Sequence, residues 1–187
     1  MNKELCFNCG DYQEFYIENK EAQVEYKGEM VRYNEKIAYC KHCNEIIEVE
    51  GLWDENLLEI QRAYCKKHNR CCLDDINQVL KMYKIGKEPL AQMLGWGKAT
   101  IKRYFTGILP SEQYSNEIKK LIESPKYFKE KLLEAQKDNK KALKSSTYKK
   151  VLKQIENLLE EQIDKNNTDL TNTEMRSQNL RYGCMAA

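Results

Sequence analysis

The sequence has little of what a membrane span, an export signal or an acid–base active site requires. No apolar run approaches the roughly 20 residues that a transmembrane helix needs. Residues 1–6 also lack the apolar stretch of a secretory signal. We therefore expect a cytoplasmic protein that does not contact a membrane.

Catalytic motifs are equally scarce. The chain has only two histidines, His42 and His68, and neither has a setting suited to acid–base catalysis. It has no glycine-rich phosphate loop, no serine in a nucleophile-elbow motif and no convincing carboxylate pair. These absences predict that the protein is not an enzyme.

Cysteine, in contrast, is abundant, and four of the eight cysteines form two CxxC pairs separated by 30 residues. In a chain without an export signal, such pairs favour metal binding over disulfides. Four thiolates form the closed tetrahedral set of one structural zinc ion. Gly10 and Asn44 follow the pairs and tolerate the positive φ of a tight turn. Four unrelated buried thiols or two disulfides are the alternatives. The predicted zinc ligands are Cys6, Cys9, Cys40 and Cys43.

Charge divides the chain into two parts. Residues 1–60 hold 6 Lys and Arg against 14 Asp and Glu, a net charge of −8, whereas residues 61–187 hold 25 against 15, a net charge of +10. The acidic part is a poor candidate for contact with nucleic acid, and the basic part is a fair one.

Residues 1–50 contain short apolar and aromatic runs that partly alternate with polar residues, a pattern typical of β-strands. Polar turns are predicted at Glu18–Glu21 and Lys27–Glu29, and a last strand at Ile46–Val49. So small a sheet buries little apolar surface, and we expect the metal to supply much of its folding free energy.

After Gly51 the hydrophobic period becomes helical as far as about Lys67, with Asp54 as the expected N-cap. The predicted inward stripe of this connecting helix is Trp53, Leu57, Ile60 and Tyr64. A second cluster follows at its end. It is either a set of packed free thiols, which we favour, or a second metal site. Its members are Cys65, His68, Cys71 and Cys72.

Three short helices are predicted next. The first begins at Asp74 or Asp75, and the second carries Pro89 in its first turn, where no N–H is needed. The turn Gly95–Gly97 separates it from a third helix over Lys98–Phe105. A short helix, a glycine turn and a second short helix are typical of a helix-turn-helix.

The third helix has the pattern of a recognition helix. Its apolar residues occur at core spacing, and its basic residues fall on the opposite side. The start of the second helix offers a lysine and free N–H groups to a phosphate. A solvated basic face on a plain helical bundle is the alternative. The residues predicted to face DNA are Lys87, Lys98, Ala99, Lys102 and Arg103.

The predicted architecture is therefore α+β with two domains. A small zinc-bound, β-rich domain spans residues 1–52, and a connecting helix spans 53–70. An all-α helix-turn-helix domain spans 71–124. A helical extension over 125–165 either dimerises or docks a partner, or is only a marginal solvated helix, and a polar tail over 166–187 is expected to be disordered.

The order of these features resembles the MqsA antitoxin family, which has a YgiT-type zinc finger and a phage-repressor-like helix-turn-helix. The likeness lies in Tyr39–Glu45 and in Leu94–Gly107 with the following Pro110–Leu121, and covers roughly residues 4–130. Tyr39–Glu45 looks like the family's second zinc knuckle. The helix-turn-helix motif is shared with many repressors and is less specific.

The resemblance implies an antitoxin of a type II toxin–antitoxin system. Its N-terminal domain binds a toxin, and its helical domain dimerises and represses its own operon at a palindromic operator. Arg103 falls at the position of a base-contacting arginine, whereas Ala99 replaces a base-reading asparagine. Lys98, Thr100 or Lys102 then read the operator instead. The alternative is a zinc-ribbon adaptor or regulator that binds a protein partner without a cognate toxin.

Overall fold

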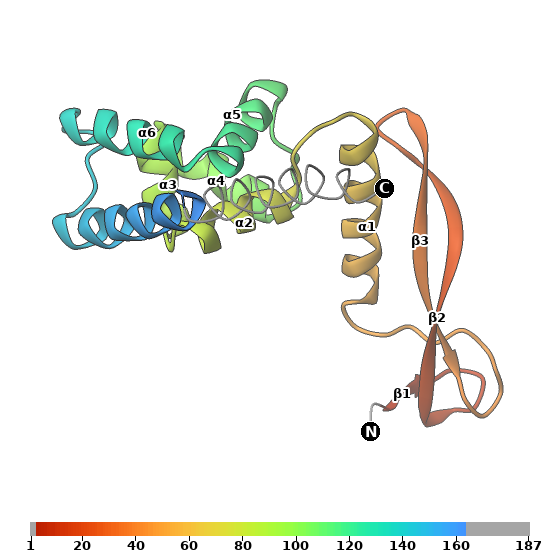
Figure 1. The fold of residues 1–187 in the computed structure, drawn as a ribbon. Helices are drawn as coiled ribbons and strands as arrows, with labels where there is room; N and C mark the ends of the chain where they lie inside the picture. Colours follow the sequence, from red (N-terminus) through yellow and green to blue (C-terminus); the bar gives the residue numbers. More distant parts are fainter. Residues whose placement is uncertain (1–2, 164–187) are drawn as a thin grey trace, which may run out of the picture. The chain divides into compact units, whose positions relative to one another are not determined.

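The computed structural model describes residues 3–163 and has an α+β architecture, as predicted. A three-stranded antiparallel sheet comes first and is followed by helices (Figure 1). The chain divides into two units. One holds residues 3–73 with 107–116, and the other holds 74–106 with 117–163. The predicted disordered tail over 166–187 lies outside the described residues.

The sheet has the order β1 (Lys3–Cys6), β2 (Asp11–Tyr26), β3 (Glu29–Cys40). β2 and β3 form one long hairpin whose register runs from Phe15 opposite Cys40 to Tyr26 opposite Glu29. Its two-residue turn has φ of 53° at Lys27 and 82° at Gly28. Two positive φ values are typical of a type I′ turn, which matches the twist of the strands. The turn predicted at this position is confirmed.

Two other sequence predictions for this region are wrong. Glu18–Glu21 is not a turn but lies inside β2, opposite the segment from Asn34 to Ile37. The polar run fits because this hairpin leaves most of its side chains exposed or half-buried. Ile46–Val49 is not a strand, since Ile46 makes only an isolated bridge with Tyr39.

Helix α1 (Leu52–Lys67) begins after Gly51, whose φ is 80°, without a side-chain cap. The prediction of Asp54 as N-cap is therefore wrong, although Asp54 and Glu55 do lie in the first turn. The predicted inward stripe is right in part. Ile60 is buried, and Leu57 and Tyr64 are half-buried, but Trp53 is 74% exposed. The residues that α1 buries are Asn56, Ile60, Gln61 and Cys65.

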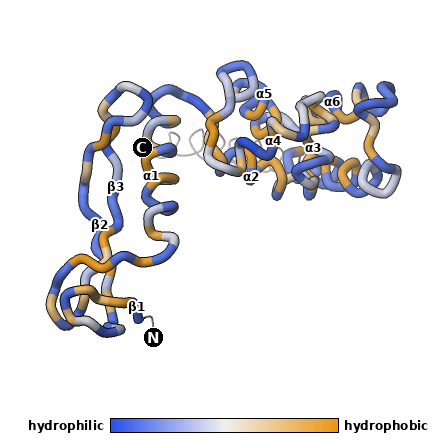
Figure 2. The backbone as a smooth tube through the Cα atoms, turned by 180° about the vertical axis from the view of Figure 1, so that it is seen from behind, coloured by the Kyte–Doolittle hydropathy of each residue, from blue (hydrophilic) through white to orange (hydrophobic). Residues whose placement is uncertain are grey.

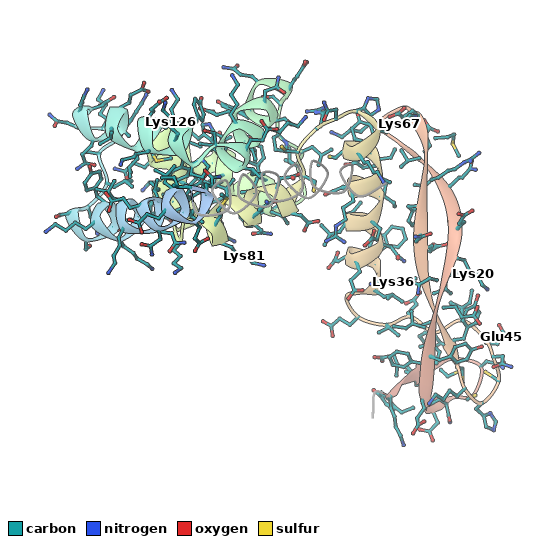
Figure 3. All side chains as sticks on the ribbon, in the orientation of Figure 1. Lys20, Lys36, Glu45, Lys67, Lys81 and Lys126 are labelled. Carbon is teal, nitrogen blue, oxygen red and sulfur yellow. The ribbon has the colours of Figure 1, made fainter. Side chains whose placement is uncertain are left out.

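Asn56 explains why α1 turns this face inward. Its amide oxygen accepts a hydrogen bond from the backbone N–H of Lys36 (2.8 Å), and its amide nitrogen donates to the carbonyl of the same residue (2.9 Å). Lys36, labelled in Figure 3, lies beside the start of α1. These two hydrogen bonds satisfy the buried side-chain amide of Asn56, and they occupy backbone groups of Lys36 at the free edge of β3. The helix predicted as a connector thus packs on the hairpin.

The helical part comprises six elements between residues 73 and 163, none of them long and apolar enough to cross a membrane. Hydrophobic and hydrophilic residues alternate along these helices (Figure 2). The elements are α2 (Leu73–Met82), α3 (Lys87–Leu94), α4 (Lys98–Phe105), α5 (Glu112–Glu123), α6 (Pro125–Lys137) and a last helix over 145–163.

The region beyond residue 124 is part of the helical core. Ser124 caps α6 by accepting a hydrogen bond from the N–H of Tyr127, and Pro125 occupies the first turn. Phe128 and Leu132 of α6 are fully buried, as are Val151 and Ile155 of the helix over 145–163. The segment predicted as an extension therefore packs within the second unit.

Candidate metal centre and nucleic-acid interface

The candidate metal centre lies at the end of the sheet that carries the chain's N-terminal strand. Cys6 ends β1 and Cys40 ends β3, and both side chains are buried. Cys9 and Cys43 lie in the turns that follow and are half-buried. β2 pairs with both strands and brings the two turns together. All four Sγ atoms lie within 4.8 Å of one another.

The sulfur spacing suits a tetrahedral ion. The Sγ atoms of Cys6 and Cys43 are 3.5 Å apart, and those of Cys9 and Cys40 are 3.9 Å apart. Four thiolates placed tetrahedrally at about 2.3 Å from a metal lie about 3.8 Å from one another. The two sulfur–sulfur separations lie on either side of that value, so the four predicted ligands are arranged to hold a metal ion.

Both CxxC pairs form the same local turn. The N–H of Gly10 donates to the carbonyl of Cys6 (2.8 Å), and the N–H of Asn44 donates to the carbonyl of Cys40 (2.9 Å). φ is 70° at Gly10 and 60° at Asn44, which confirms the positive values expected from the sequence. The N–H of His42 points at the Sγ of Cys40 (3.4 Å). Such N–H groups favour a thiolate over a thiol.

A small apolar shell surrounds the sulfurs. Ile47 is 2% exposed and packs with Cys6 and Cys40, and the partly buried Phe15 and Val49 complete the cluster. This cluster is the core of the end of the sheet that carries the cysteines. Because it is so small, bound metal is expected to contribute strongly to its stability.

The four cysteines differ in their electrostatic surroundings. A hydrogen bond from the side chain of Asn8, with another from the backbone of Glu45, lowers the pKa of Cys43 to about 6. Desolvation and hydrogen bonds among the thiols raise the pKa of Cys9. A metal-free cluster therefore retains thiol protons that a bound ion displaces. Asn8 was missed in the sequence, although its place between two ligands signals such a contact.

The second cysteine cluster is arranged differently. Cys65 and Cys71 are buried, and their thiols donate to the carbonyls of Cys71 (3.5 Å) and Ser115 (3.2 Å). The imidazole of His68 contacts Glu29. Within residues 3–163, the only group of three or more potential metal ligands is that of Cys6, Cys9, Cys40 and Cys43. His42, which is exposed, lies beside Cys9 but outside this group.

Helix α4 separates apolar from basic side chains. Ile101 and Tyr104 are 2% and 5% exposed. Thr100 is half-buried. The predicted DNA-facing residues of α4 that are exposed are Lys98, Ala99, Lys102 and Arg103. The helix thus presents a cationic face to solvent while its other face is packed in the unit.

The turn before α4 is fixed by its central tryptophan. Gly95 ends α3 with φ of 72°. Trp96 is 5% exposed, and its indole N–H donates to the carboxylate of Glu117 (3.2 Å). The indole also meets the ring of Tyr104 edge-on, with centroids 5.8 Å apart. No local sequence signal identifies Glu117 as this partner, because it comes from a later helix.

Lys87, predicted to hold a phosphate, is exposed at the start of α3. Its ammonium group lies 3.4 Å from the ring centroid of Phe105, at the end of α4. This cation–π contact joins the two helices. It also places the Lys87 charge next to the last turn of α4, where Arg103 lies.

No protein-family model, no curated protein sequence and no solved structure matches this chain. The four-cysteine centre and the cationic face of α4 are therefore the two features from which a function can be inferred.

Proposed function

We propose that this protein is a DNA-binding transcriptional regulator of the antitoxin type, similar to the MqsA family, with one structural zinc ion. The observation that carries the proposal is α4, a short helix with a packed apolar side and an exposed basic side, held to α3 by the turn Gly95–Gly97. This is the arrangement that a helix-turn-helix uses to enter the major groove.

The exposed side chains of α3 and α4 have different roles in the proposed DNA contact. Arg103 has the forked guanidinium that binds guanine O6 and N7, and the resemblance places a base-reading arginine there. Ala99 offers a methyl group suited to contact with thymine. Lys98 and Lys102 lie one helical turn apart and reach bases or phosphates, and Lys87 supplies a further phosphate contact.

Zinc is the proposed occupant of the four-cysteine centre because a tetrahedral set of four thiolates is its usual structural site. Four protein ligands leave no open coordination position for substrate or water, so the ion's role is to fold the end of the sheet. We propose no enzymatic activity for the protein.

The remaining features of the proposal concern partners and location. A palindromic operator requires two copies of the recognition helix, so the protein acts as a homodimer through its helical part. The acidic N-terminal part binds a toxin protein. Both partners belong to the cytoplasm, where thiolate zinc sites persist and disulfides are rare.

A gel-shift assay with the full-length protein and its own promoter tests the DNA-binding proposal. Lys102→Glu with Arg103→Glu is expected to abolish sequence-specific binding. The matched control is Lys149→Glu with Lys150→Glu, which makes the same charge change on two exposed residues of the helix over 145–163. The control should retain a clear shift. Equal loss in both variants indicates a diffuse charge effect and overturns the assignment of α4.

A zinc-ribbon adaptor without DNA binding is the second candidate. The observation that favours it is the strongly acidic character of residues 1–60, which suits a basic protein partner. Co-purification distinguishes the two candidates. A bound small basic protein together with a promoter shift supports the antitoxin, whereas a bound protein without any shift supports the adaptor.

A further inference from the structure

A groove of about 810 Å³ opens on the first unit between β3, the loop over residues 46–51 and the start of α1. Ala38 and Ile47, 1% and 2% exposed, provide apolar lining. The N–H of Ile47 donates to the carbonyl of Ala38 (2.9 Å), which ties the loop to β3. The groove is therefore lined in part by side chains of the packed core, and a backbone hydrogen bond holds its loop wall to β3.

The groove is negatively charged. Four carboxylates line it, on Glu4, Glu35, Glu48 and Glu50. Within the described residues, none of the four forms an ion pair. Lys36 is the single basic residue of the lining, and its ammonium is already paired with Glu55 (2.8 Å). Clustered unpaired carboxylates attract a cationic partner and repel the phosphates of DNA.

Two large apolar side chains of the lining are exposed. Trp53 is 74% exposed and Ile46 is 65% exposed. α1 leaves Trp53 outside because it buries Asn56 and Gln61 instead. Tryptophan is the side chain most often found as an energetic anchor in protein interfaces. An exposed indole beside unpaired carboxylates combines the apolar and charged parts of a binding site.

We propose that this groove docks an extended basic segment of a partner protein. Lysines or arginines of the segment pair with the four carboxylates, and an aliphatic or aromatic side chain packs against Trp53 and Ile46. The inference rests on the proposal that the N-terminal part binds a protein, and it specifies where that protein binds and which chemistry the groove recognises.

A labelled peptide tests the recognition chemistry. The probe is a fluorescein-labelled ten-residue peptide in which lysine alternates with leucine, and the control probe has glutamate in place of lysine. Fluorescence anisotropy with the full-length protein should show binding of the lysine peptide only, and the Kd should rise with added salt. Binding of the glutamate peptide with equal affinity overturns the proposal.

Variants test the location. Glu48→Lys with Glu50→Lys should weaken binding by about tenfold or more, and Trp53→Ala by about fivefold with unchanged salt dependence. The control Glu21→Lys with Glu25→Lys makes the same charge change on exposed residues of β2, and it should raise the Kd for the lysine peptide by less than about twofold. Equal weakening by groove and control variants, or weakening by none, overturns the proposal.

The same variants separate this inference from the DNA-binding proposal. All groove substitutions leave α3 and α4 unchanged, so the promoter shift should persist in each of them. Loss of peptide binding with a retained shift supports the groove. A protein that binds the lysine peptide through the groove but shows no promoter shift refutes the DNA-binding proposal alone.

Discussion

The ring of Tyr83 lies flat against the ring of Phe128, with centroids 3.6 Å apart and planes inclined by 20°. Tyr83 follows α2 and Phe128 lies in α6, and both are 0% exposed. The hydroxyl of Tyr83 also donates to the carbonyl of Leu121 (2.6 Å). The segment that carries the predicted recognition helix therefore shares its core with residues beyond 124.

We expect Phe128→Ala to destabilise the helical unit by about 3–5 kcal/mol, since it removes a fully buried ring and leaves a cavity beside Tyr83. Urea unfolding followed by far-UV circular dichroism measures the change. The control is Leu133→Ala in the same helix, where the side chain is 42% exposed and the expected loss is about 0.5 kcal/mol. Similar losses in both variants contradict a core role for α6.

The four-cysteine cluster and the bounds and two faces of α4 could be predicted because their signals are local. Two CxxC pairs with Gly10 and Asn44 define two turns whatever the rest of the chain does. α4 is bounded by glycine and shows its two faces within eight residues. The difference in net charge between residues 1–60 and 61–187 follows directly from a count of the charged residues in the sequence.

The features that the sequence does not predict correctly depend on contacts between residues that are far apart in sequence. The buried face of α1 is set by Asn56 and Gln61, whose amides bond backbone groups of Lys36 and Gly107. Polar residues do not contribute to hydrophobic periodicity, so the periodicity of this helix predicts that Trp53 faces inward instead. The place of α6 depends likewise on Tyr83, which lies far from Phe128 in sequence.

We expect Asn56→Ala to cost about 1–3 kcal/mol, because it leaves the N–H and carbonyl of Lys36 without their partner at a partly buried position. Hydrogen exchange gives a local readout, as the Lys36 amide should exchange faster in the variant. The neighbouring control Glu55→Ala removes only a partly exposed ion pair with Lys36, worth about 0–1 kcal/mol. An unchanged Lys36 exchange rate in Asn56→Ala contradicts the proposed pairing.

Zinc removal should unfold the cysteine-bearing end of the sheet before the helical unit. Native mass spectrometry is expected to show one zinc ion in the wild-type protein and none in Cys40→Ser. Cys72→Ser, which alters a cysteine outside the cluster, should retain the ion. After chelation, amides of β1 and the start of β2 should lose exchange protection while those of α3 and α4 keep it. Retained protection in β1 argues against a structural metal.

Acid should weaken the contact between the hairpin tip and the end of α1. The ammonium of Lys67 lies 2.5 Å from a carboxylate oxygen of Glu29, and the imidazole of His68 contacts the same carboxylate. Lys67, and to a smaller extent His68, hold the pKa of Glu29 below its ordinary value of 4.5. A carboxyl group whose pKa is lower in the folded than in the unfolded state stabilises the fold. This contribution is complete when the pH is above the unfolded-state pKa, and it is lost as the pH falls through the folded-state pKa. Glu29→Gln removes this contribution at neutral pH and should leave a smaller loss of stability on acidification.

Urea unfolding at about pH 7 and about pH 3 measures the difference, and the wild-type protein should lose more stability than Glu29→Gln between the two. Glu14, whose pKa Lys41 also lowers, contributes equally to both proteins and cancels in the comparison. Glu25→Gln is the control, since Glu25 is an exposed carboxylate of β2 without an ion pair among the described residues. It should behave as the wild-type protein does. An acid-induced loss in Glu29→Gln as large as in the wild-type protein means that the Glu29 contact does not stabilise the fold.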